Sequence, residues 1–206
     1  NMPHYIIYMN TLVARKGIPE INKTFEHVRS LAGDTKIIWN IYLRSVAQVT
    51  ALGDPFAMSK AAEAFKLFPQ DDDIFGLYRI MTYGQQRVVQ AEQLYKKGNL
   101  LYNEKKFEEA FNLFNQAFDL DPLEYTYALN TGFALYENGK DEEAIQYFKM
   151  AGNSQKSAIK EKAMRYTALS FYKIGAQSES CAVFMKLMNT YPKRMYRQEF
   201  NKYCSN

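Results

Sequence analysis

The chain has 206 residues, of which 47% are hydrophobic, and its formal net charge is +4 at pH 7. An apolar share of this size is ordinary for a folded protein, so the composition excludes an intrinsically disordered chain. Much of the positive charge lies near the end, at Lys193, Arg194, Arg197 and Lys202, while the rest of the chain is nearly balanced. Because a nucleic-acid binder usually carries a basic stripe through the body of its fold, the charge pattern gives only weak support to that partner, and we do not expect it.

Residues 1–70 predict helices with an irregular hydrophobic pattern. They divide into two stretches, each with two helices around a glycine, and the turns fall at Gly17 and Gly53. We therefore expect two degenerate helical hairpins in this segment. Residues 71–90 supply about one more helix, a connecting helix that the last members of an acidic run, Asp71 to Asp73, are expected to cap.

From residue 91 onward the sequence repeats itself with a period of 34 residues. Small and aromatic residues of the first unit return at the same places in the second unit, where Gly98, Ala110, Phe114 and Ala117 reappear as Gly132, Ala144, Phe148 and Ala151. A third copy follows after a shift of two residues, with Ala168 in the place of the glycine. This period is the length of a helix–turn–helix unit, and the recurring residues allow one unit to stack on the next.

The three clear units occupy residues 91–124, 125–158 and 161–194. Each predicts a pair of amphipathic helices, because its apolar residues recur three to four positions apart. Residues 195–206 form a further amphipathic segment, which fits a terminal helix that caps the exposed end of the stack.

These residues resemble the tetratricopeptide repeat family, whose pattern of 34 positions combines a large apolar residue, glycine, alanines, aromatics and a proline. The match covers residues 91–194, and residues 1–70 fit it only in a degenerate form. The resemblance implies an all-α fold, a right-handed α-solenoid of antiparallel helix hairpins. It also implies a concave groove, lined by the first helix of each hairpin, that binds a peptide or helix of a partner protein.

The resemblance implies which side chains on the first helices line this groove. They are Tyr95, Asn99, Tyr102, Leu129, Asn130, Phe133, Tyr136, Lys162, Arg165, Leu169 and Tyr172. Tyr102, Tyr136 and Tyr172 occupy one register, so stacked hairpins would place them side by side as an amphipathic row. Such a row could hold an extended or helical peptide while the hydroxyl groups find polar partners. The alternative is that these tyrosines are family consensus and pack between helices.

Some members of the family grip the terminal carboxylate of a chaperone's tail with two asparagines and several cations. Three of those positions match in this sequence, at Asn99, Asn130 and Lys162. Tyr95 and Tyr166 replace the lysine and arginine expected at two others, which removes charge-assisted hydrogen bonds to a carboxylate. Arg165, next to Tyr166, is the one side chain that could restore this carboxylate clamp.

Motifs for catalysis, metal binding and cofactor binding are missing from the sequence, which has no glycine-rich phosphate loop, metal-binding histidine pair or serine nucleophile motif. Cys181 and Cys204 have no close partner and no histidine nearby in sequence. We therefore expect two free thiols, with no disulfide or zinc, and a reducing, cytoplasmic compartment. No run approaches the roughly 18 apolar residues that a membrane span needs. The prediction is a protein that is not an enzyme, binds no cofactor or metal and has no membrane span.

Other partners and assemblies stay open. Residues 37–43, followed by Gly53, faintly resemble the opening of a pentatricopeptide repeat, a family that reads single-stranded RNA. The repeat number and small size also resemble the three-repeat chaperones of secreted proteins. A homodimer is open as well, because the exposed end of a stack is a natural dimer surface. The chain opens with Asn1 before Met2, so the sequence also leaves room for a removed targeting segment.

Overall fold

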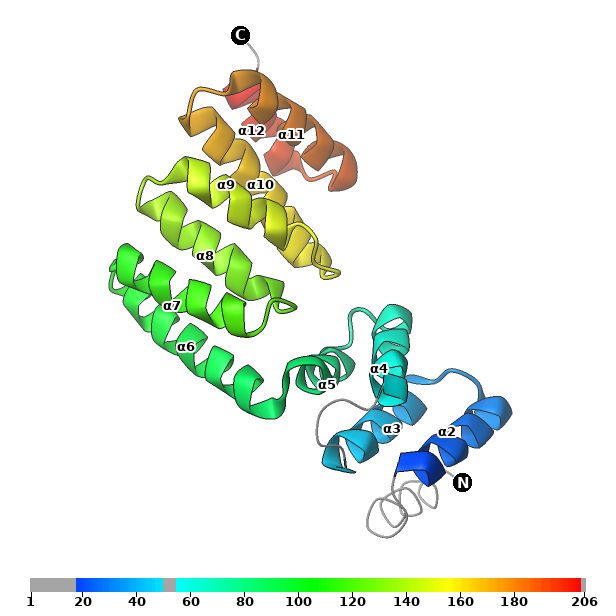
Figure 1. Cartoon of the computed structure of the whole chain (residues 1–206). Helices are drawn as coiled ribbons and strands as arrows, with labels where there is room; N and C mark the ends of the chain where they lie inside the picture. Colours follow the sequence, from blue (N-terminus) through cyan, green and yellow to red (C-terminus); the bar gives the residue numbers. More distant parts are fainter. Residues whose placement is uncertain (1–17, 50–54, 205–206) are drawn as a thin grey trace. The chain divides into compact units, whose positions relative to one another are not determined.

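The computed structural model describes residues 18–49 and 55–204 (Figure 1). Over these residues the chain forms eleven α-helices, α2 to α12, and no strand, which confirms the predicted all-α fold. The chain divides into two compact parts, unit 1 with residues 1–88 and unit 2 with residues 89–206. None of the described helices is long and apolar enough to cross a membrane.

Unit 1 contains four described helices, α2 (Ile18–Ala32), α3 (Lys36–Val49), α4 (Pro55–Leu67) and α5 (Asp72–Tyr83). Helix α2 packs against α3, and α5 packs against both α3 and α4. The turns predicted at Gly17 and Gly53 lie outside the described residues. Between α2 and α3 the chain turns at Gly33, whose φ of 74° is in the left-handed region that favours glycine.

Aromatic side chains fill the core between α2 and α3. The ring of Phe25 lies 4.7 Å from that of Trp39 and 4.0 Å from that of Tyr42, and all three side chains are fully buried. The carboxylate of Asp34 accepts hydrogen bonds from Nε1 of Trp39 at 3.0 Å and from Nε of Arg29 at 2.6 Å. The polar edge of the tryptophan is therefore satisfied where the aromatic core meets the loop.

The sequence predicted that the last members of the acidic run before α5 cap that helix, and this is wrong. The cap is the first member of the run, Asp71. Asp71 has an extended backbone, and its side chain accepts a hydrogen bond from the backbone amide of Ile74 at 2.9 Å. Asp72 and Asp73 lie inside the first turn, where negative charge is favoured by the helix dipole. Asp71 is the cap because the helix begins at Asp72, the residue that follows it, earlier than the sequence predicted.

Unit 2 is a succession of helix hairpins (Figure 1). Its helices are α6 (Gln85–Asn103, which begins in unit 1), α7 (Phe107–Leu120), α8 (Tyr125–Glu137), α9 (Asp141–Ala151), α10 (Ser157–Lys173), α11 (Gln177–Thr190) and α12 (Arg194–Cys204). From α7 onward, each helix packs against the next in chain order. The 34-residue period therefore corresponds to one pair of helices.

The repeated glycines lie where the two helices of a hairpin touch. A Cβ atom added to Gly98 would come 2.6 Å from the ring of Phe114, and one added to Gly132 would come 2.6 Å from the ring of Phe148. Both rings are fully buried. Only a residue without a side chain leaves room for them, which explains why glycine and phenylalanine recur together.

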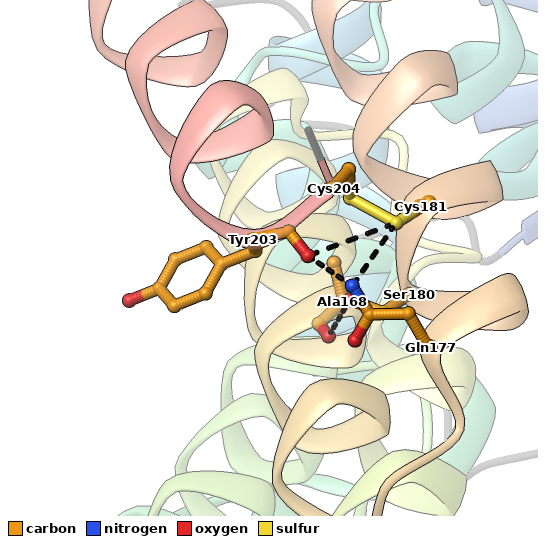
Figure 2. The surroundings of a disulfide bond; sticks show 6 residues. All are labelled: Ala168, Gln177, Ser180, Cys181, Tyr203 and Cys204. Atoms are coloured by element: carbon orange, nitrogen blue, oxygen red, sulfur yellow. Dashed lines mark hydrogen bonds between the residues drawn. A yellow bond between two sulfur atoms is a disulfide. The ribbon is translucent and has the colours of Figure 1, made fainter. Parts of the chain in front are cut away.

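The third hairpin closes in a different way, because Ala168 stands in the place of the glycine. Ala168 and Phe184 are both fully buried in the cluster that α10 shares with α11. Ser180 replaces the alanine of the other units, and its hydroxyl donates a hydrogen bond to the backbone carbonyl of Ala168 at 2.9 Å. This bond satisfies a buried hydroxyl and joins α10 to α11 (Figure 2).

The two cysteines form a disulfide, so the prediction of two free thiols is wrong. Cys181 on α11 and Cys204 on α12 are bonded, with their Cα atoms 5.6 Å apart (Figure 2). The side-chain amide of Gln177 donates to the backbone carbonyl of Tyr203 beside this bond. The sequence did not reveal the pair because α12 packs back along α11, which brings together residues 23 positions apart. The expectation of a reducing compartment rested on those thiols and loses its basis.

Candidate partner-binding surface

The first helices of the successive hairpins, α6, α8 and α10, form a layer with α12, which we call the first-helix layer. Side chains join each of these helices to the next one in the layer. At the first junction, Nδ2 of Asn130 on α8 donates to the hydroxyl of Tyr95 on α6 at 3.2 Å and to the carbonyl of Thr126 at 2.8 Å. The Tyr95 ring packs 5.0 Å from Tyr127 and 5.6 Å from Phe114. Both donors of the Asn130 amide are therefore used within the chain.

Aromatic contacts join α8 to α10. The ring of Tyr166 lies 4.6 Å from Phe133 and 5.2 Å from Tyr136, both in edge-on geometry. The ammonium group of Lys173 lies 3.3 Å from the centre of the Tyr136 ring and 3.5 Å from a carboxylate oxygen of Asp141. Tyr136 therefore contacts both a cation and another aromatic ring.

An ion pair and an aromatic pair join α10 to α12. Nε of Arg165 donates to the Glu199 carboxylate at 2.9 Å, and Nη2 donates to the same carboxylate. The rings of Tyr172 and Tyr203 lie 4.7 Å apart. Arg165 is the cation that could have restored a carboxylate clamp, and this bidentate pair already occupies its guanidinium group.

Six tyrosines from four helices thus belong to the first-helix layer. We call them the tyrosine row: Tyr95, Tyr102, Tyr136, Tyr166, Tyr172 and Tyr203. Burial raises the pKa of Tyr102 to about 12, helped by the charge of Glu137. Burial also raises the pKa of Tyr136 to about 12, helped by the charge of Asp141. Both hydroxyl groups stay protonated at neutral pH and can donate hydrogen bonds.

The predicted groove residues differ in their accessibility. Tyr172, 42% exposed, and Lys162 are open to solvent. Half-buried positions are Tyr95, Asn99, Tyr102, Asn130, Phe133, Tyr136 and Arg165. Leu129 and Leu169 are buried in the clusters between hairpins, at 4% and 9% exposure. These two leucines therefore belong to the core and not to the exposed face of the layer.

Sequence reasoning did not place Tyr203 and Glu199 in this layer. Both lie on α12, which continues the first-helix layer beyond the third hairpin. The spacing in the sequence could have indicated this pair, because Glu199 follows Arg165 by 34 residues, which is the repeat period. A second pairing at this junction has a similar separation, since the hydroxyl of Tyr196 donates to Glu161.

Among the residues that the structure describes, no cluster of three or more histidine, cysteine, aspartate or glutamate side chains could hold a metal ion. The layer provides aromatic area with hydroxyl groups at its edge, and Lys162 is the exposed lysine among the predicted groove residues.

Two segments of the chain match family models described as tetratricopeptide repeat, residues 91–123 and residues 162–194. No curated protein matches the chain. Among solved structures, the N-terminal domain of stress-induced protein-1 (STI-1) from C. elegans is similar, with 22% identity over 57% of this chain and 96% of that one, at a TM-score of 0.53.

A second similar structure is the first tetratricopeptide domain of Spaghetti (RPAP3) bound to the HSP90 peptide SRMEEVD. It has 20% identity, covers 56% of this chain and 91% of that chain, and gives a TM-score of 0.51. At these identities the likeness concerns the fold alone.

Proposed function

Because this chain is a tetratricopeptide repeat protein, we propose that it is a non-enzymatic scaffold that binds a peptide or helix of a partner protein on the first-helix layer. The family generally serves as an interaction module. The observation that carries the proposal is the tyrosine row. Its rings come from α6, α8, α10 and α12, and hydrogen bonds or ring contacts join each of these helices to the next one in the layer.

Tyrosine suits this role because its ring provides apolar contact area and its hydroxyl provides a hydrogen bond. The rings of Tyr95, Tyr136 and Tyr172 are fixed by their neighbours before a partner arrives. The partner segment then bears most of the cost of becoming ordered, and the scaffold bears little. We expect modest affinity for a short peptide and higher affinity for a longer segment that folds on binding.

The segment that we propose is an internal stretch of the partner, not its terminal carboxylate. One structural neighbour carries an HSP90 peptide, but two polar side chains that a carboxylate clamp would use here already have partners. Asn130 donates to Tyr95 and to the Thr126 carbonyl, and Arg165 binds Glu199. A clamp would have to break these bonds before it could hold a carboxylate.

Selection of random peptides on the immobilised full chain tests the proposal. We expect selected peptides to bind the chain and to lose about tenfold in affinity when Tyr172, the most exposed member of the row, is replaced by alanine. Tyr147→Ala is the matched control, because Tyr147 lies on α9, a second helix, where its hydroxyl donates to Asn115. Equal losses in the two variants would contradict the proposal, as would retention of single-stranded RNA in place of peptides.

A further inference from the structure

The far end of unit 2 carries a concave surface that contains none of the tyrosine row. A cavity of about 540 Å³ lies between the end of α11, the loop at Pro192 and one side of α12. Met188 and Phe200 form its apolar part, and both are half-buried. Arg194 and Arg197 line it as exposed cations.

Helix α12 has the orientation that α10 has one hairpin earlier. Tyr166 of α10 faces α8 through its contact with Phe133. Glu199 of α12, 33 residues after Tyr166, faces α10 through its bond with Arg165. Helix α12 is therefore placed like the first helix of a further hairpin.

The same offset of 33 residues between α10 and α12 shows which part of a hairpin would occupy the cavity. On α10, Met164 and Ala168 belong to the cluster that α10 shares with the second helix of the hairpin, and the carbonyl of Ala168 accepts a hydrogen bond from Ser180 of that helix. On α12, 33 residues later, the corresponding residues are Arg197 and Asn201, and both line the cavity. The cavity therefore lies where the second helix of α12's own hairpin would pack, and no described residue fills that place.

The charge of this surface is of one sign. Glu199 is the only acidic residue on α12, and Arg165 neutralises it. Among the described residues, neither Arg194 nor Arg197 has a carboxylate partner. Lys193 is paired with Glu161 on α10. A helix that packs here would bring its own side chains against two unpaired guanidinium groups, and acidic residues would complement them.

We infer that this end surface binds an acidic amphipathic helix of a partner protein, which packs on α12 as the second helix of a hairpin. An apolar stripe on that helix would cover Met188 and Phe200, and carboxylates beside the stripe would meet Arg194 and Arg197. A second copy of this surface would not fit, because like charges would meet. The inference is independent of binding on the first-helix layer.

The test is a titration of the full chain into a fluorescein-labelled helical peptide of about four turns, with a leucine stripe flanked by glutamates. We expect saturable binding that weakens about tenfold with the double variant Arg194→Glu/Arg197→Glu and weakens as salt rises. The same peptide with glutamine in place of glutamate should bind about tenfold less well. Lys96→Glu/Lys97→Glu is the matched control, since these two exposed lysines lie on α6 and should leave binding unchanged.

The site is located by amide chemical-shift changes in the isotope-labelled chain. Changes at residues 188–201 support the inference, and they should persist in Tyr172→Ala, which disrupts the first-helix layer. The inference is overturned if no saturable binding occurs, if the glutamine peptide binds equally well, or if the shifts fall on α6, α8 and α10 instead. A dimer of the chain that the double arginine variant abolishes would overturn it in favour of a second copy.

Discussion

Arg165 on α10 holds Glu199 on α12 through charge-assisted hydrogen bonds from Nε, at 2.9 and 3.1 Å, and from Nη2, and so attaches the terminal helix to the third hairpin. Both side chains are mostly shielded, with 29% and 17% of their surface exposed. The pair also decides what the surface can bind, because it removes a free cation from the first-helix layer and a free carboxylate from α12.

Glu199→Gln should lower the stability of unit 2 by about 1–2 kcal/mol, because the neutral amide loses the charge-assisted bonds to Arg165. Urea unfolding followed by circular dichroism measures this loss. In a double-mutant cycle with Arg165→Met, the second change should add little once the first is made. Fully additive losses would mean that the two side chains do not interact in solution.

Reduction of the disulfide should destabilise the attachment of α12. Cys181 and Cys204 are separated by 23 residues, and a cross-link of that span stabilises a chain by about 3 kcal/mol in the chain-entropy account. The double variant Cys181→Ser/Cys204→Ser should therefore melt at a lower temperature than the oxidised chain. The oxidised chain treated with a reductant should match the double variant, and a reductant without effect would show that the bond is not formed in solution.

Gly132→Ala should destabilise unit 2 by about 1–3 kcal/mol, because its new methyl group would overlap the buried Phe148 ring. Gly76→Ala is the control, since Gly76 is also inside a helix but has open space around it. That control should be neutral or stabilising by about 0.5–1 kcal/mol, as helix propensity predicts. Thermal unfolding should show a lower melting temperature for Gly132→Ala and an unchanged or higher one for Gly76→Ala, and equal decreases in both variants would contradict this packing.

High pH should destabilise unit 2 through Tyr136. Its pKa is raised to about 12 in the folded chain, while an unfolded tyrosine titrates near 10. The folded state therefore keeps the proton over this interval while the unfolded state loses it, so the stabilisation present below about pH 10 is lost as pH rises toward 12. Tyr136→Phe should flatten this dependence in urea unfolding measured from pH 9 to 11.5. An unchanged slope would show that the hydroxyl is not buried.

Low pH should destabilise unit 1 through Asp71. Burial raises the pKa of this carboxyl, but the ion pair with Lys36 and the hydrogen bond from the Ile74 amide outweigh it, so the pKa lies below its usual range. The stabilisation is present above about pH 4 and is lost as pH falls further. Asp71→Asn keeps a cap but removes the charge, so fluorescence of Trp39, the only tryptophan, should show a smaller loss of stability on acidification. Identical acid profiles would contradict this role of Asp71.

The sequence predicted the hairpins of unit 2 well because their signals are local. Gly98 and Phe114 recur 34 residues later for a steric reason that any copy of the hairpin must satisfy. The disulfide and the role of Glu199 escaped prediction because both depend on how α12 packs on α10 and α11, which no local pattern records. Sequence reasoning also could not separate Leu129, which is buried, from exposed residues in the same face of a helix.

The central claim is that the tyrosine row is the surface that receives a partner segment. The direct measurement is the dissociation constant of one selected peptide for the wild-type chain, for Tyr172→Ala and for Tyr147→Ala, each checked for an unchanged circular dichroism spectrum. The account predicts a loss of about tenfold for Tyr172→Ala and a change below about twofold for Tyr147→Ala. Peptides that bind both variants as tightly as the wild type would contradict it.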